Sequence, residues 1–224
     1  MKRLNLLWLA FFLLAAPAPL ASGQTESAKP QESPDDARAY FNKGVEHYDA
    51  GQYEQAVEAF REAIRLKPDL AGPYYNLGLT FYAQQRYAEA VEQYKEAIRL
   101  EPVFPVAYYN LGCAYHALGR YREAIVQFKQ AIRLKPDLEE AYNNLGITYG
   151  AQRRYREAIQ QFKLAIRLKA DDAQAHYNLG MAYVMVDDGK GAMEECLALQ
   201  KLKSELAREL LSQIRKRWRV QIAA

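Results

Sequence analysis

The sequence predicts an all-α protein built from stacked helical hairpins, and three observations support this prediction. A short motif, "YYNLG" at 74–78, recurs in related forms five times at a spacing of 34 residues. Alanine and aromatic residues recur at the same spacing later in each copy. Within a copy, apolar residues lie three and four positions apart, as on one side of a helix. A unit this short cannot bury its own apolar surface, so the copies must stack on one another.

Composition and charge are those of an ordinary soluble protein. Of the 224 residues, 50% are hydrophobic and 25% are charged. The net charge is +3, and Lys2 and Arg3 supply two of the positive charges. The rest of the chain is close to neutral, so we expect no nucleic-acid partner.

The first residues have the pattern of a secretory signal. Lys2 and Arg3 precede an apolar run at 4–16, and small residues follow. Ala21 and Gly23 suit a signal peptidase, which predicts a signal peptide at 1–23 and a mature chain that begins at Gln24. As a helix the run would span about 20 Å, short of a bilayer core of about 30 Å. We therefore expect export to a periplasm or the medium. An uncleaved membrane anchor is the alternative, and it is the one way in which we expect membrane contact.

A flexible linker is predicted at 24–36, because this stretch is polar and contains proline. Its last residues, Ser33 to Asp36, also resemble a helix start. They provide a capping side chain, a proline for the first turn and two acids for the positive end of a helix.

The repeat consists of positions that keep one residue type through the copies. The glycines are Gly44, Gly78, Gly112, Gly146 and Gly180, and the alanines are Ala56, Ala90, Ala124, Ala158 and Ala192. The aromatics of the second half are Phe60, Tyr94, Phe128 and Phe162, and the closing prolines are Pro68, Pro102 and Pro136. Glycine and alanine at these positions allow two helices of one unit to approach closely.

This pattern resembles the tetratricopeptide repeat (TPR), whose signature has the same residue types over 34 residues. The resemblance covers 37–206 as five units, 37–70, 71–104, 105–138, 139–172 and 173–206. It implies a right-handed solenoid of helix-turn-helix units. The fifth unit departs from the pattern, with Cys196 at the aromatic position and Ser204 in place of the closing proline. A further helix at 205–219, with Leu206, Leu210, Ile214 and Trp218 at helical spacing, is predicted to cap the last unit.

The asparagine of the motif is predicted to lie away from the core. On a helical wheel Asn76 lies roughly 150° from the stripe of Leu77 and Phe81, so its amide is expected to be free. The resemblance implies that first helices line a concave groove, where an amide can donate to and accept from a peptide backbone. The repeat domains of O-linked N-acetylglucosamine transferases look similar at this position, and they hold extended peptides by a ladder of such asparagines. The predicted ladder is Asn42, Asn76, Asn110, Asn144 and Asn178. Alternatively, asparagine is only the common residue of this family at that position.

Apolar side chains are predicted to share the groove with the amides. They are Phe41, Tyr75, Leu79, Tyr82, Tyr109, Tyr177 and Met181, and His116 is expected to face the groove beside them as a binding residue. An exposed apolar surface of this kind marks an interaction site. The alternative is that these residues pack one first helix against the next. The carboxylate clamp of the family is excluded, because Phe41, Val45 and Val106 stand where it needs charged or amide residues.

Nothing in the sequence predicts catalysis, a cofactor or a metal site. His47, His116 and His176 lie in different repeat positions without metal-ligand spacing. Cys113 and Cys196 are expected to be free thiols, because the repeat places them two units apart.

The expected function is non-catalytic binding of an extended or helical segment of a partner protein. Two alternatives stay open. One is a structural scaffold that self-associates as a homo-oligomer, and the other is binding to a membrane surface through the basic C-terminal helix, Lys201 to Arg219.

Overall fold

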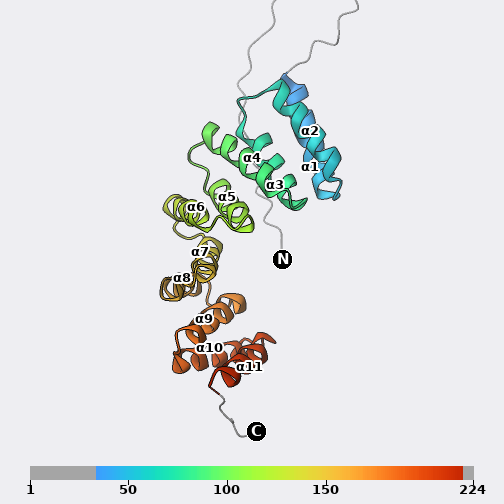
Figure 1. The fold of residues 1–224 in the computed structure, drawn as a ribbon. Helices are drawn as coiled ribbons and strands as arrows, with labels where there is room; N and C mark the ends of the chain where they lie inside the picture. Colours follow the sequence, from blue (N-terminus) through green and yellow to red (C-terminus); the bar gives the residue numbers. More distant parts are fainter. Residues whose placement is uncertain (1–33, 219–224) are drawn as a thin grey trace, which may run out of the picture. The chain divides into compact units, whose positions relative to one another are not determined.

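The computed structural model describes residues 34–218, which form eleven α-helices and no strand. The predicted signal peptide and most of the predicted linker lie outside this range. The helices are α1 (Pro34–Asp49), α2 (Tyr53–Leu66), α3 (Ala71–Ala83), α4 (Tyr87–Leu100), α5 (Pro105–Ala117), α6 (Tyr121–Leu134), α7 (Glu139–Ala151), α8 (Tyr155–Leu168), α9 (Ala173–Met185), α10 (Gly189–Lys201) and α11 (Leu206–Trp218). Figure 1 shows the hairpins following one another in sequence order. The predicted all-α solenoid of helix-turn-helix units with a capping helix is confirmed for this part of the chain.

Helix α1 begins at Pro34, inside the predicted linker. The difference has a local cause, because proline is favoured in a first helical turn and the next two residues are acids. The turn inside each hairpin then spans three residues. Its middle residue has a left-handed backbone, with φ 73° at Gly51 and 72° at Gly119. Gln85 adopts the same conformation, with φ 61°.

The two helices of a hairpin approach most closely where glycine meets an aromatic ring. A Cβ added at Gly78 would lie 2.6 Å from Cε1 of Tyr94, and one at Gly112 would lie 2.7 Å from Cε1 of Phe128. Ala90 and Ala124, from the second helices, are 0% exposed. The predicted role of these small residues, close helix approach, is confirmed.

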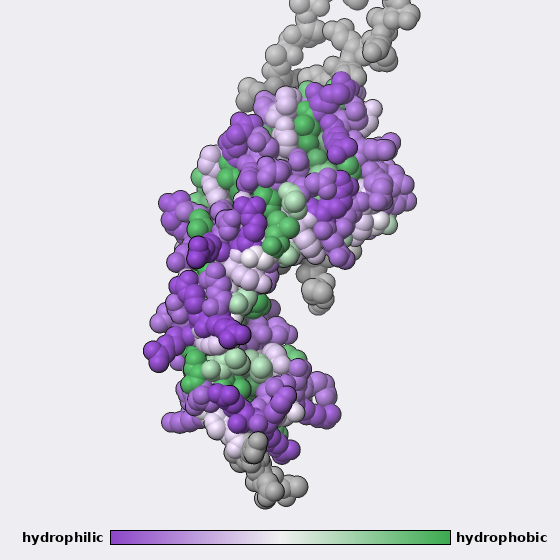
Figure 2. All heavy atoms as spheres, viewed as in Figure 1, coloured by the Kyte–Doolittle hydropathy of each residue, from purple (hydrophilic) through white to green (hydrophobic). Residues whose placement is uncertain are grey.

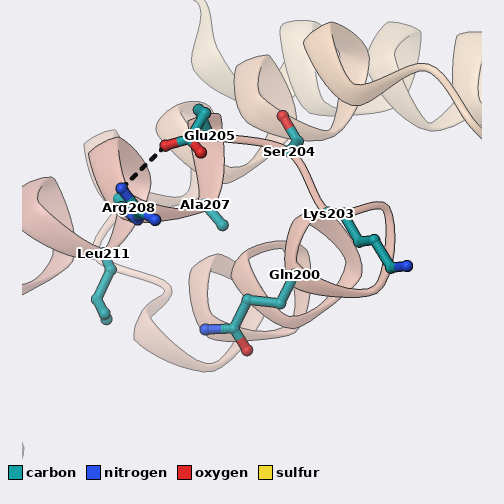
Figure 3. Close-up of a pocket in the computed structure, with 7 residues that line it drawn as sticks. All are labelled: Gln200, Lys203, Ser204, Glu205, Ala207, Arg208 and Leu211. Atoms are coloured by element: carbon teal, nitrogen blue, oxygen red, sulfur yellow. Dashed lines mark ion pairs between the residues drawn. The ribbon is translucent and has the colours of Figure 1, made fainter.

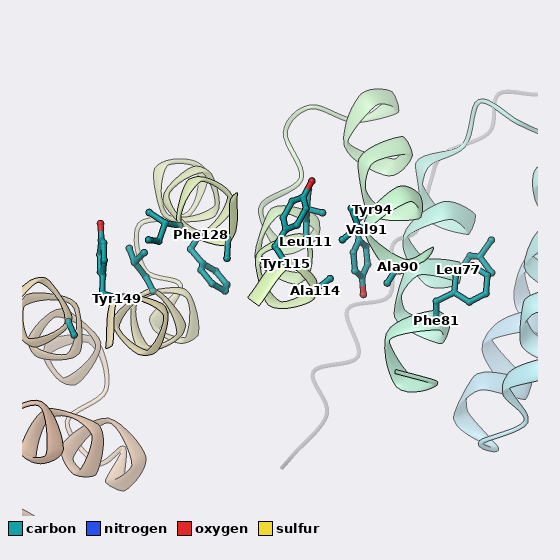
Figure 4. Packing of buried hydrophobic residues seen from close by; sticks show 14 of the residues in the cluster. Leu77, Phe81, Ala90, Val91, Tyr94, Leu111, Ala114, Tyr115, Phe128 and Tyr149 are labelled. Carbon is teal, nitrogen blue, oxygen red and sulfur yellow. The ribbon is translucent and has the colours of Figure 1, made fainter. Parts of the chain in front are cut away.

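Neighbouring units join through two kinds of contact. The second helix of one unit packs on the first helix of the next, as α4 does on α5. Successive first helices also contact each other, whereas successive second helices do not. The first helices therefore form the more tightly spaced row, and we call their solvent-facing surface the inner side. Figure 4 shows Leu77, Tyr94, Leu111 and Phe128 in the core that runs through these joints.

The fifth hairpin is completed by α11, which packs on both α9 and α10. Cys196 stands at the aromatic position of this unit and is too short to cover Gly180. Leu210 of α11, which is 0% exposed, lies over Gly180 instead. Arg217 ties the end of α11 to the α9–α10 turn, donating to both carboxylate oxygens of Asp187 at 2.8 and 2.7 Å.

Two further observations concern the described residues only. Within 34–218, none of the helices combines the length and the apolar composition that a membrane crossing requires. Cys113 and Cys196 are free thiols, as predicted, the first half-buried and the second buried.

Candidate functional site

The candidate site is the inner side of α3 and α5, which we call the inner strip. It comprises Gly72, Tyr75, Asn76, Leu79 and Tyr82 of α3 and Val106, Tyr109, Asn110, Cys113 and His116 of α5. Tyr82 is 36% exposed, and the others are half-buried. Hydrophobic residues also reach the surface elsewhere, between hydrophilic ones, as Figure 2 shows for one face of the molecule.

A ladder of hydrogen bonds runs along the first helices and joins each unit to the next. Nδ2 of Asn110 donates to the Tyr75 hydroxyl at 2.9 Å, and Nδ2 of Asn144 donates to the Tyr109 hydroxyl at 2.7 Å. At the next joint the acceptor position holds Asn143, and Nδ2 of Asn178 donates to its Oδ1 at 3.1 Å. The same two repeat positions thus make the same contact three times.

The start of the ladder shows why the acceptor matters. Phe41 occupies the acceptor position before Asn76 and has no hydroxyl. Nδ2 of Asn76 instead donates to the Gly72 carbonyl of its own helix at 2.9 Å. Asn42 has no unit before it and is exposed.

The expectation that the asparagine amides are free is therefore wrong for the N–H groups of Asn76, Asn110, Asn144 and Asn178. A helical wheel considers one helix alone, whereas the acceptor comes from the preceding unit. The amides keep part of their capacity. No hydrogen bond within residues 34–218 engages Oδ1 of Asn110 or Asn144. Asn110 also keeps its second N–H, whereas Nδ2 of Asn144 makes a second, longer hydrogen bond to Sγ of Cys113 at 3.8 Å.

The apolar residues predicted for the groove mostly pack against the core, in line with the alternative that they join one first helix to its neighbours. The ring of Tyr75 lies 4.9 Å from that of Phe104, and the ring of Tyr109 lies 5.9 Å from that of Phe128, measured between centroids. Phe41 and Leu79 pack against the main core in the same way. In a stack each first helix has neighbours on more than one side, so more than one stripe is covered. Tyr82 keeps the largest exposed fraction in the strip.

At the far end, Tyr177 and Met181 pack against the core of the last unit. The Tyr177 hydroxyl donates to Oε1 of Glu209 in α11 at 2.7 Å. The capping helix thus supplies the hydrogen-bond partner of the Tyr177 hydroxyl, a role that the first helix of a sixth unit would otherwise have had.

Burial keeps the hydroxyl and thiol groups of the strip protonated. It raises the pKa of Tyr75 to about 12, against the opposing effect of the Asn110 hydrogen bond. It likewise raises the pKa of Cys113 to about 12, which makes this thiol a poor nucleophile at neutral pH.

His116 lies at the end of α5 and contacts the next unit. Its Nδ1 is 2.9 Å from Oγ1 of Thr148, and its ring lies 5.2 Å from that of Tyr121. Oγ1 of Thr148 donates to the Asn144 carbonyl at 2.7 Å. Nε2 of His116 has no hydrogen-bond partner among the residues that the structure describes.

The other two histidines belong to local packing. His176 is 9% exposed, with Nδ1 2.6 Å from Oε2 of Glu195 and Nε2 3.1 Å from the Ala170 carbonyl. His47 is half-buried and lies 2.6 Å from Oε1 of Gln52. Within residues 34–218 no group of three His, Cys, Asp or Glu side chains has a metal-binding arrangement.

A shallow pocket lies at the α10–α11 turn, away from the inner strip. Figure 3 shows its lining side chains, among them Gln200 and Leu211, with Lys203 pointing away from both. Arg208 forms an ion pair with Glu205 there at 3.1 Å. Two cations of the predicted basic end, Arg208 and Arg217, are thus paired with carboxylates. Arg219 lies outside the described residues.

Comparison with protein families agrees with this architecture. A model of the TPR repeat matches residues 44–85, 78–119, 112–153 and 151–186, which together cover more than half of the chain. The chain belongs to the TPR repeat family. A comparison with curated proteins gives no significant match. The TPR fold is one that protein–protein interaction scaffolds use.

Solved TPR structures share the fold. The crystal structure of YrrB, described as a TPR protein with an unusual peptide-binding site, is 23% identical, with a TM-score of 0.69 over 80% of this chain and 93% of that one. MamA from Desulfovibrio magneticus RS-1 is 24% identical, with a TM-score of 0.72 over 75% of this chain and 96% of that one. A further MamA structure is 21% identical, with a TM-score of 0.69 over 86% of this chain and 100% of that one.

Sequence reasoning did not find the tyrosine–asparagine bonds of this TPR array. A signal was present, because Tyr75 and Asn110, like Tyr109 and Asn144, are 35 residues apart. A search for donor and acceptor positions one unit apart would have paired them.

Proposed function

We propose that this protein is a non-catalytic interaction module that binds an extended segment of a partner protein along its inner side. The observation that carries the proposal is the ladder of asparagine amides, whose hydrogen-bonding groups are only partly engaged within the protein. The hydroxyls of Tyr75 and Tyr109 each hold one N–H of an asparagine, which fixes the amide plane. This leaves Oδ1 of Asn110 and Asn144, and the second N–H of Asn110, for a ligand. An extended peptide offers backbone donors and acceptors at regular intervals.

Two further points support the proposal. Tyr82 and the half-buried side chains beside the amides offer apolar contact area together with hydroxyl groups. In addition, YrrB, which has the same fold, is described as having a peptide-binding site.

The test is a selection of random twelve-residue peptides by display on the full chain, followed by affinity measurements on the selected peptides. Asn76→Ala combined with Tyr82→Ala removes one amide and one exposed ring of the inner strip. Neither side chain contributes a bond between units, so the variant should fold normally. We expect affinity to fall at least about tenfold, equivalent to about 1.4 kcal/mol.

The matched control is Gln93→Ala with Val126→Ala, on second helices, where Val126 is 52% exposed. This variant should bind the selected peptides as the wild type does. Peptides that bind both variants as tightly as the wild type would refute the inner side as the binding surface.

We also propose that the chain is exported, on the basis of the apolar run at 4–16 and the small residues after it. Expression in a host with a secretory pathway, followed by N-terminal sequencing, tests this. A mature chain that begins at Gln24 is expected. A chain that keeps Lys2 and Arg3 and stays in the membrane fraction would indicate an anchor.

A further inference from the structure

The inner strip has no charged residue, which is unusual for a solvated helix surface. Neither α3 nor α5 contains an Asp, Glu, Lys or Arg at any position. Exposed ion pairs lie at the starts of the second helices α4 and α6, Arg86–Glu89 and Arg120–Glu123, and α4 also carries Lys95–Glu92. The sides of α3 and α5 that keep contact with solvent are therefore neutral, although a solvated helix side is ordinarily charged.

This neutrality restricts what can bind. A charged side chain brought onto the strip would lose hydration and would meet no opposite charge on α3 or α5. A charged group near the strip is Glu140 of α7, which lies close to Tyr109. An uncharged segment would lose little hydration free energy, and it would gain apolar contacts and backbone hydrogen bonds to the amides. Complementarity therefore selects an uncharged stretch of polypeptide.

The hydrogen bonds of His116 fix which of its nitrogens carries the proton. The single hydroxyl proton of Thr148 is used by the Asn144 carbonyl, so Oγ1 can only accept from Nδ1 of His116. Thr80 occupies the repeat position of Thr148, with Tyr48 rather than a histidine at the position that corresponds to His116, and makes the same bond to the Asn76 carbonyl at 2.8 Å. The threonine bond is thus a property of the repeat, and His116 must carry its proton on Nδ1.

In the neutral ring Nε2 is then an unprotonated acceptor. Burial lowers the pKa of His116, which favours this neutral form. Tyr121 of α6 is the titratable group against the ring, and Thr148 meets it from α7. From α3, α4, α6 and α7, no charged side chain in the described range contributes to the shift.

We propose, resting on the function above, that the bound segment is an uncharged stretch of a partner protein, one of whose N–H or O–H groups donates to Nε2 of His116. Acidification then releases the segment. Protonation converts Nε2 from an acceptor to a donor and places a positive charge on a neutral surface.

The first test needs no ligand. Nitrogen-15 NMR of the histidine rings in the full chain at pH 7.5 should show the proton of His116 on Nδ1. Thr148→Val keeps the side-chain size at a site that is 0% exposed and should abolish the preference of the His116 proton for Nδ1. A proton on Nε2 in the wild type would overturn the proposal.

The second test uses the display-selected peptides, synthesised with acetylated and amidated ends. At pH 7.5 they should be depleted in Asp, Glu, Lys and Arg relative to the starting library. Their affinity should fall about tenfold as the pH drops through the titration midpoint of His116 measured by NMR. His116→Phe should lower affinity at pH 7.5 and remove most of the pH dependence.

Methylation of each peptide backbone nitrogen in turn then locates the donor. Methylation at one position should strongly lower the affinity of the peptide for the wild type. The same methylation should lower the affinity for His116→Phe or Thr148→Val only slightly, because in these variants the acceptor is already missing or misoriented. Equal losses on all three proteins would overturn the hydrogen bond to Nε2.

The outcomes separate this inference from the proposed function. Peptides rich in charged residues that still depend on Asn76 and Tyr82 would overturn the inference and leave the function intact. Peptides that do not depend on the inner side would overturn both.

Discussion

At the scale of single residues, Tyr94 is the clearest mismatch between a side chain and its surroundings. The same repeat position holds Phe60, Phe128 and Phe162 in other units. Tyr94 is 0% exposed, and its hydroxyl has no hydrogen-bond partner among the described residues. A buried hydroxyl without a partner loses its hydration without compensation, so this group destabilises the second unit.

Tyr94→Phe should therefore raise the free energy of unfolding by about 1–2 kcal/mol. Urea denaturation at neutral pH measures this. Tyr75→Phe is the contrasting variant, because the Tyr75 hydroxyl accepts from Asn110. It should lower the free energy of unfolding by about 0.5–1.5 kcal/mol. Equal effects of the two variants would mean that the Tyr94 hydroxyl has a partner.

The motif glycines allow a second prediction at this scale. Gly112→Ala places a Cβ against the buried ring of Phe128 and should lower the free energy of unfolding by about 1–3 kcal/mol. Gly150→Ala, also inside a first helix, has no atom within 4 Å of the added Cβ. It should raise the free energy of unfolding by up to about 1 kcal/mol, through helix propensity alone. Thermal unfolding of both variants gives the comparison.

At the scale of elements, the joint between the fourth and fifth units contains a buried acid. Glu139, at the start of α7, is 8% exposed. Burial, and next a hydrogen bond with Asp172, raise the pKa of Glu139 from 4.5 to about 7. Glu140 adds repulsion in the same direction, and Lys169 opposes it. Asp172 caps α9, accepting from the backbone N–H groups of Gln174 and Ala175.

A raised pKa means that the folded state binds this proton more tightly than the unfolded state does. The contribution of Glu139 to stability is therefore present below about pH 4.5 and is lost as the pH rises to about 7. Glu139→Gln should unfold at a higher temperature than the wild type at pH 8, and this advantage should disappear at pH 4. Glu140→Gln, at the adjacent exposed position, should show a smaller pH-dependent difference, because it removes only the repulsion that Glu140 adds to Glu139. Calorimetry at the two pH values provides the measurement.

At the scale of the whole molecule, the described residues form a linear array. Each hairpin contacts only its neighbours, and α11 contacts only α9 and α10. Stability in such an array is the sum of the contributions of the units and of the joints between them. Damage at one end should therefore stay at that end.

Leu210→Ala removes the side chain that covers Gly180 and should cost about 2–5 kcal/mol. Hydrogen exchange followed by mass spectrometry should show lost protection in α9 to α11 and little change in α1 to α4. Phe128→Ala in the central unit should lower protection in the hairpins on both sides of it. Uniform loss along the chain in response to Leu210→Ala would contradict the nearest-neighbour description.

The sequence predicted the hairpins well because each of these repeat positions makes its contact within its own unit. Glycine opposite an aromatic residue, with alanine beside it, indicates a closely packed helix pair independently of the adjacent units. The inner side was harder to predict. A helical wheel placed Asn76 and Asn110 correctly off the hairpin core, yet it could not supply the Tyr75 hydroxyl, which comes from the preceding unit.

The sequence alone thus determined the repeat length, the pairing of helices within each unit and the atypical fifth unit, since these follow from spacing along one chain. Only the tertiary structure decided how the units share their surfaces. It placed Leu210 where an aromatic was missing, bound the amides of Asn110, Asn144 and Asn178 to the preceding units, and directed the proton of His116 toward Thr148. The reason is physical: these contacts join residues about one repeat apart in sequence, and they depend on how neighbouring helices stack.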